Sequence, residues 1–167
     1  AVVATDGLGI MVSPETMRRR AIEAGVTGQL GEEAFEQWLL QSGHSPGDSE
    51  WVSQTHARAA YDFKMTSAQW ECTESPLFVD VKTTRSAHET ALHLTISEIR
   101  WAAVHAEYRI ARVSSLTETS AEVRILGDVS GVCTTLLDSL SGLPDRVSVD
   151  SVEIEPSLFS EMATGQI

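Results

Sequence analysis

The sequence has few cysteines and no long hydrophobic run, and both shortages narrow the classes of protein to which it can belong. Cys72 and Cys133 are its two cysteines, and neither has a CxxC neighbour, so we expect free thiols in a reducing cytoplasm. No stretch approaches the roughly 20 uninterrupted apolar residues of a membrane-spanning helix, and the N-terminus lacks the basic-then-apolar layout of a signal peptide. These features predict a cytoplasmic protein without a membrane segment.

Basic residues are also scarce. The chain has 12 Lys and Arg against 24 Asp and Glu, a net charge of −12, and residues 113–167 hold 2 basic and 9 acidic residues, a net of −7. Proteins that bind nucleic acid tightly without sequence preference concentrate Lys and Arg on one face. The charge argues against such a binder, but it does not exclude a nuclease, whose active site needs carboxylates.

Local patterns in the 167 residues predict one domain that contains helices and strands. Apolar residues at helical spacing predict a helix over residues 31–41, and Ser13-Pro14 could open a short separate helix. Thr95 and Glu98 form a capping-box pattern, which predicts a second helix to about residue 105. Strands are expected at residues 51–55, 59–65, 77–83, 108–113 and 121–126, followed by a short helix over 131–140 and a last strand over 146–154. The order through residue 126 is helix, three strands, helix, two strands, with the first three strands as an antiparallel meander.

Two of these strands bring acidic residues together. An antiparallel register of residues 59–65 with 77–83, centred near Glu71, sets Asp62 opposite Asp80. Because side chains alternate along a strand, Asp80 and Lys82 point to the same face. Two neighbouring carboxylates repel each other and favour a divalent cation, and hard oxygen ligands favour Mg²⁺ or Mn²⁺.

These residues resemble the PD-(D/E)xK nuclease superfamily, whose pattern is an aspartate, a variable gap, and then an acidic residue, any residue and lysine. Here the pattern is Asp62 followed by Asp80-Val81-Lys82. The chain is closer still to one branch, the domain at the C-terminus of the plant No Vein protein that is also found in many bacterial defence-type proteins. The branch motifs are matched at residues 31–33, 60–63, 79–84, 94–98 and 108–113. Asp80 stands where glutamate is commoner in the family, and Ala60 stands where glycine is usual.

The resemblance implies an α/β fold with a restriction-endonuclease-like core, in which helices flank a mixed β-sheet. On this interpretation residues 1–27 are a lead-in segment and residues 28–126 form the core. Residues 127–167 form an acidic C-terminal extension packed on the same domain.

The function implied by the resemblance is metal-dependent hydrolysis of DNA within a bacterial defence or restriction-type protein. Asp62, Asp80 and Glu32 would hold Mg²⁺ or Mn²⁺, and Lys82 would position or help deprotonate the attacking water. Three residues are expected to contact nucleic acid: Thr83 and Thr84 through their hydroxyls, and Arg85 through its guanidinium. A homodimer, or attachment to other domains of a larger defence protein, is also expected.

Simpler alternatives remain open at each position. The segment around Asp80 and Lys82 could be an ordinary amphipathic strand, and Glu32 competes with Glu33 and Glu36 on the same helix. Glu98 is explained by capping alone. At the level of function, the alternative is an inactive module of nuclease fold that senses DNA or binds another protein. A third possibility is that the acidic C-terminal part masks the nuclease face.

Overall fold

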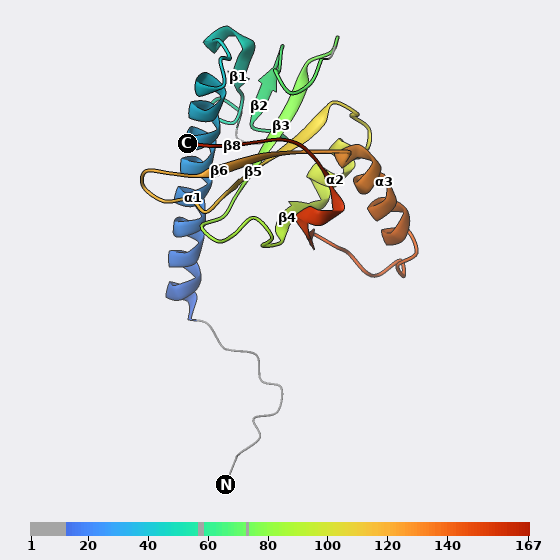
Figure 1. Ribbon diagram of the computed structural model, residues 1–167. Coiled ribbons are helices and arrows are strands. Elements are labelled where there is room, and N and C mark those ends of the chain that lie inside the picture. The colour runs from blue at the N-terminus through green and yellow to red at the C-terminus, as the bar shows by residue number, and fades with distance from the viewer. Residues whose placement is uncertain (1–12, 57–58, 73) are drawn as a thin grey trace.

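The computed structural model describes residues 13–56, 59–72 and 74–167, and at its centre is a six-stranded mixed sheet (Figure 1). In spatial order the strands are β1 (Ser49–Trp51), β2 (Phe63–Met65), β3 (Leu77–Thr83), β5 (Tyr108–Ser114), β6 (Glu122–Gly127) and β8 (Ser160–Gln166). Strands β3 and β5 run parallel, and the other neighbours in this sheet run antiparallel. A second, two-stranded antiparallel sheet pairs β4 (Leu92–Thr95) with β7 (Ser151–Ile154).

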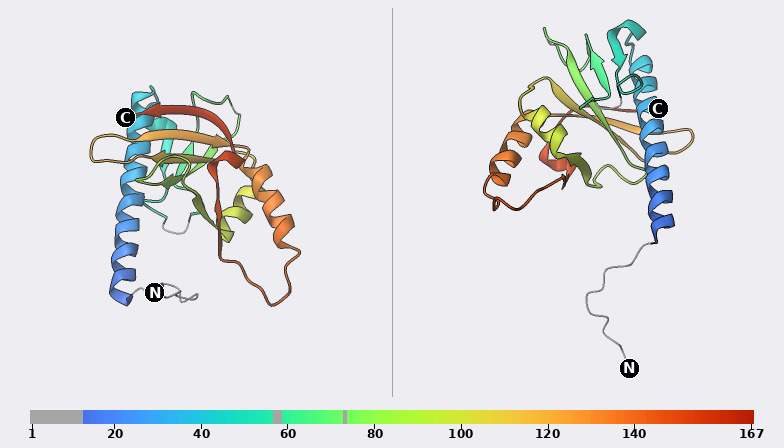
Figure 2. Two further views of the ribbon diagram at one scale, coloured as in Figure 1. Left: turned by 60° about the horizontal axis from the view of Figure 1, so that its bottom comes forward. Right: turned by 180° about the vertical axis from the view of Figure 1, so that it is seen from behind.

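Helices cover both faces of the large sheet, with α1 (Pro14–Gln41) on one face and α2 (Ile96–Ala103) and α3 (Val129–Leu140) on the other (Figure 2). The two faces follow the period of two along each strand. In β5, Ala111 and Val113 join the core under α1, whereas Tyr108 and Ile110 join the core under α2 and α3. The expected α/β fold, with a mixed sheet between helices, is therefore confirmed.

Several local predictions are confirmed. Strands β1, β2 and β3 form the antiparallel meander, and β2 pairs with β3 in the register Phe63↔Val79. Continuing that register by one residue sets Asp62 opposite Asp80, as the sequence predicts. The bounds of the first two strands differ from the prediction, because β1 ends at Trp51, where the first strand was expected to begin, and β2 covers only Phe63–Met65. Helix α2 begins at the capping box, in which the Thr95 side chain accepts from the Glu98 N–H and the Glu98 side chain accepts from the Thr95 N–H.

Other local predictions are wrong. Residues 14–41 form one helix of 28 residues and not two, because Gly25 and Gly28 weaken a helix by only about 1 kcal/mol each and do not end it. The last predicted strand is shorter, with β7 covering Ser151–Ile154. Strands β4 and β8 are additional: β4 is only four residues long and runs directly into α2, and the sequence of β8, SEMATGQ, lacks the alternation typical of a strand.

Residues 127–167 are built into both sheets. They supply α3 and β7, and β8 forms the edge of the six-stranded sheet beside β6. Cys133 of α3 is buried in the core, Cys72 is exposed, and both cysteines are free thiols, as expected. Among the helices of the described residues, none combines the length and the apolar character needed to cross a bilayer.

Candidate active site

The candidate site lies at the edge of β3, beyond the point where β2 begins. Strand β2 starts at Phe63, so the Val81 N–H of β3 has no backbone partner on that side. The Asp62 carboxylate takes this place: its Oδ2 accepts a hydrogen bond of 2.7 Å from the Val81 N–H. The Asp62 N–H in turn donates to the Val79 carbonyl at 2.9 Å. Backbone pairing therefore fixes Asp62 beside Asp80.

Lys82 lies on the same face of β3 as Asp80 and contacts two carboxylates. Its Nζ is 2.9 Å from Asp80 Oδ2 and 2.8 Å from Glu98 Oε1 on α2. Burial by itself would lower the pKa of Lys82, but the charges of Asp80 and Glu98 outweigh it and raise that pKa. The side chain therefore stays an ammonium ion at physiological pH.

The two aspartates are held in an environment that disfavours their charged forms. Burial, together with the negative charge of Asp80, raises the pKa of Asp62 to about 8. Burial also raises the pKa of Asp80, although Lys82 opposes the shift. Without a cation, the pair therefore keeps at least one proton near neutral pH.

Tyr108 fixes the chain segment that leads to Asp62. Its side chain is fully buried in the core under α2, and its hydroxyl donates to the Ala60 carbonyl at 2.9 Å. Burial and the nearby charge of Asp80 raise the pKa of this phenol well above its ordinary value. Tyr108 therefore remains a neutral donor next to the carboxylates.

Glu32 of α1 is the one of three neighbouring glutamates that turns toward the sheet. It is half-buried, whereas Glu33 and Glu36 are exposed. Its Oε2 accepts from Trp51 Nε1 at 2.7 Å and from the Ser53 hydroxyl at 2.5 Å. Its charge contributes to the raised pKa of Asp62, but among the described residues Glu32 does not form a metal-binding group with the two aspartates.

The site has a donor set that suits a hard divalent cation, although it is not a complete cage. In residues 13–56, 59–72 and 74–167, no three His, Cys, Asp or Glu side chains are arranged to hold a metal ion. Asp80 Oδ2 is buried, and no described group gives it a hydrogen bond with good geometry; Lys82 is its ion-pair partner. Mg²⁺ commonly binds through one or two carboxylates and keeps several waters. Asp62 and Asp80 fit that pattern.

The three residues expected to contact nucleic acid lie apart from the carboxylates. Thr83 points to the opposite face of β3, where its side chain fills the space that a Cβ on Gly31 would need. The Thr84 hydroxyl accepts from the Ser86 N–H at 3.1 Å and so holds a turn. Arg85 is exposed, and with Thr83 and Thr84 it lines a groove beside α1 that also includes Arg20. The groove therefore brings together two cations distant in sequence, with Glu23 as an acidic neighbour.

Two residues of the site were not assigned a role there from the sequence. The capping box explains Glu98 fully, so nothing local indicates its second bond to Lys82. Arg112 of β5 is paired with Lys82 in the parallel register, and it is buried. Its guanidinium donates to the Thr90 carbonyl at 2.6 Å and to the Lys82 carbonyl at 3.4 Å. Only the alternation of β5, combined with the β3–β5 register, could have placed it.

Comparison of the chain with protein-family models, with curated proteins and with solved structures finds no match. The resemblance to PD-(D/E)xK nucleases therefore stays a prediction from the sequence motifs.

Proposed function

We propose that this chain is a metal-dependent nuclease domain of the PD-(D/E)xK type that hydrolyses phosphodiester bonds in DNA. The observation that carries the proposal is the arrangement of two aspartates and one lysine on a single face at the end of the β2–β3 hairpin. Asp62 is fixed against β3 by its bond to the Val81 N–H, and Lys82 contacts Asp80 at 2.9 Å. The sequence pattern of the superfamily, an aspartate followed later by an acidic residue, any residue and lysine, supports the same proposal.

Each residue has a distinct role in the proposed reaction. Asp62 and Asp80 hold Mg²⁺ or Mn²⁺, with Glu32 adding negative charge beside Asp62. The bound ion supplies Lewis-acid neutralisation of charge on the phosphate. Lys82, which contacts Asp80 at 2.9 Å, would position or help deprotonate the attacking water and stabilise charge on the phosphate. Glu98 keeps the lysine side chain directed at the site.

The biological context of the proposal comes from the resemblance. DNA is the proposed substrate, and a bacterial defence or restriction-type protein is the proposed setting. The groove that contains Arg20 and Arg85 lies on the α1 side of the sheet, away from the carboxylates, so its two cations would contact only a more distant part of the DNA. A cytoplasmic location fits the two free thiols, and a homodimer would present a second site to the opposite DNA strand.

A second candidate is an inactive module that binds a protein partner. The observation that favours it is charge: the chain carries −12, and Lys82 is already neutralised by Asp80 and Glu98. A site that is acidic before any cation binds repels a phosphate backbone and attracts a basic surface. The two candidates differ in whether the site binds a divalent cation.

The decisive experiment is nicking of supercoiled plasmid, unmodified and base-modified, with Mn²⁺ or Mg²⁺. We expect the parent chain to nick the plasmid, and we expect Asp80→Asn and Lys82→Ala to lower the rate by about 100-fold or more. Glu36→Gln is the matched control, because Glu36 is an exposed carboxylate one turn from Glu32, and it should leave the rate unchanged. Equal nicking by all four proteins would contradict the proposal.

Cation binding is measured separately by thermal unfolding. Mn²⁺ should raise the melting temperature of the parent chain and of Glu36→Gln, but not that of Asp80→Asn. A chain that shows neither the Mn²⁺-dependent shift nor cleavage would favour the inactive module.

A further inference from the structure

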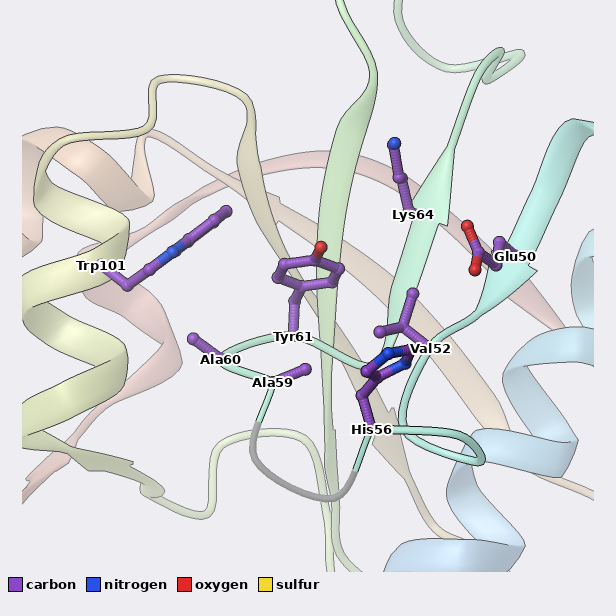
Figure 3. A pocket seen from close by; sticks show the side chains of 8 residues that line it. All are labelled: Glu50, Val52, His56, Ala59, Ala60, Tyr61, Lys64 and Trp101. Atoms are coloured by element: carbon purple, nitrogen blue, oxygen red, sulfur yellow. The ribbon is translucent and has the colours of Figure 1, made fainter.

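A concave site lies on the α2 side of the sheet, where Tyr61 directly precedes Asp62. It is a pocket of about 700 Å³ between α2 and strands β1 and β2 (Figure 3). Trp101 projects from α2 on one side, Val52 and His56 lie on the other, and Tyr61 stands between them. Pockets of roughly 300 to 1,000 Å³ are the size that holds small organic ligands, so this one is large enough for a nucleotide.

The aromatic side chains that line the pocket, Tyr61 and Trp101, pack against other aromatic rings. The Tyr61 and Trp101 rings are 5.1 Å apart between centroids. The His105 ring stacks on the Trp101 ring, with 3.5 Å between their centroids. The Phe78 ring packs against the Trp101 ring nearly at right angles. Tyr61 and Trp101 are nevertheless only half-buried. The result is a preformed, partly exposed aromatic surface. Because its side chains are already ordered, little free energy is lost in ordering them when a planar ligand binds.

The polar groups of the pocket suit a nucleotide better than a purely apolar ligand. Lys64 of β2 supplies an ammonium group that can contact a phosphate, and Glu50 of β1 supplies a carboxylate that can accept from the amino group of a base. His56 adds a further polar edge beside Val52. The pocket thus combines a flat apolar face with one cation and one acceptor.

The pocket and the candidate active site share one segment of the chain. Tyr61 directly precedes Asp62, and consecutive Cα atoms are about 3.8 Å apart. The Ala60 carbonyl of the same segment is fixed by the Tyr108 hydroxyl. A base on Tyr61 and a phosphate at Asp62 would therefore belong to the same nucleotide or to adjacent nucleotides.

We propose that this pocket binds one unpaired nucleobase of the substrate, stacked on Tyr61, with an adjoining phosphate on Lys64. The inference rests on the proposed function and specifies its substrate: a single-stranded or locally unpaired polynucleotide. A base within a duplex is stacked on both faces and must leave the stack to reach the ring. Base-aromatic stacking accepts every base, so the pocket selects for an exposed base and not for a sequence.

The test is fluorescence anisotropy with a labelled hexamer of deoxythymidine in EDTA, where no metal-dependent cleavage can occur. We expect the parent chain to bind this probe more tightly than an abasic hexamer of the same charge. Tyr61→Ala should weaken binding of the thymidine hexamer about tenfold and leave the abasic hexamer unaffected. Tyr61→Phe is the matched control, since it keeps the ring and should keep the affinity.

A second variant guards against misfolding, because Tyr61 packs on Phe78 and Trp101. Lys64→Gln should weaken binding of thymidine monophosphate and leave binding of thymidine unchanged. Equal affinity for the thymidine and abasic hexamers, or no effect of Tyr61→Ala, would overturn the inference. Displacement of the hexamer by N-acetyltyrosinamide at concentrations where thymidine monophosphate has no effect would overturn it too, and would indicate a peptide site.

The outcomes also separate this inference from the proposed function. If the chain binds the base-containing hexamer in EDTA but never nicks plasmid, the nucleobase pocket is supported and the nuclease function is rejected. If the chain nicks plasmid with metal but does not distinguish the two hexamers, the nuclease function is supported and the nucleobase pocket is rejected.

Discussion

Lys82 lies between carboxylates from two different elements, Asp80 on its own strand and Glu98 on α2. Its side chain is 17% exposed, so these charges interact with little screening by solvent. Glu98 has two partners at once, because its other oxygen accepts from the Thr95 N–H at 2.6 Å. One residue therefore starts a helix and orients the lysine of the candidate site.

Two substitutions separate the role of Glu98 in capping α2 from its role as the ion-pair partner of Lys82. Thr95→Ala removes the hydroxyl that caps α2 and should lower the free energy of unfolding by about 1 kcal/mol. Glu98→Ala removes a cap bond and the partner of a mostly buried ammonium group, so it should cost more, about 2 kcal/mol. Urea unfolding measures both values, and equal losses would show that the ion pair contributes nothing to stability.

The pH dependence of stability in the metal-free chain should reflect Asp62. Its pKa is about 8 in the folded state, against 3.8 ordinarily, so the folded chain keeps a proton that the unfolded chain releases. The stability gained from that proton is fully present below about pH 4, and it is lost as the pH rises through about 8. Urea unfolding in EDTA from about pH 5 to about pH 9 should show this loss.

The control for that titration is Asp62→Asn, which has no proton to release. Its free energy of unfolding should fall less over the same pH range, and the two pH profiles should differ most above pH 8. Parallel profiles for the two proteins would show that Asp62 titrates normally.

At the scale of elements, α1 differs most from what its sequence suggests. Its C-terminal half was predictable, because Ala34, Phe35, Trp38 and Leu39 lie on one buried stripe. Its N-terminal half extends beyond the sheet (Figure 1), and Ile22 and Val26 there are more than half exposed. Ser13 starts this half by accepting from the Thr16 N–H at 3.1 Å. The cap was visible in the sequence, but the continuity through Gly25 and Gly28 was not.

Two glycines of α1 should respond in opposite ways to the same substitution. Apart from its chain neighbours and the backbone of its own helix, no described atom lies within 4 Å of a Cβ placed on Gly28, so Gly28→Ala should stabilise the chain by about 0.5 to 1 kcal/mol through helix propensity. A Cβ on Gly31 would overlap the Thr83 side chain, so Gly31→Ala should destabilise the chain. Urea unfolding of both variants provides the comparison, and a gain of stability in Gly31→Ala would refute this close contact of α1 with β3.

At the scale of the whole molecule, the acidic residues 127–167 are a structural part of the fold. Val129 and Cys133 of α3 and Ile154 of β7 are buried in the core under α2. Strand β8 pairs along β6, and β7 supplies the partner of β4. Removing this segment would expose apolar core and the backbone edges of two strands.

A chain that ends at Leu126 should therefore fail to fold, and should not become a more active nuclease. We expect its circular dichroism spectrum to lack the cooperative thermal transition of the full chain. A truncated chain that melts cooperatively and nicks plasmid faster than the full chain would contradict this expectation. That result would instead support the possibility that the acidic segment masks the site.

The sequence by itself determined what depends on neighbours along the chain. The capping box of α2, the alternation in β3 and the β2–β3 hairpin are local patterns, and the hairpin register places Asp62 opposite Asp80. Only the tertiary structure decided which distant side chains join them. Glu98 meets Lys82, Arg112 lies beside it and Thr83 packs under Gly31 because α2, β5 and α1 pack against β3. Such contacts depend on how whole elements bury their apolar faces, and no local pattern of residues encodes that arrangement.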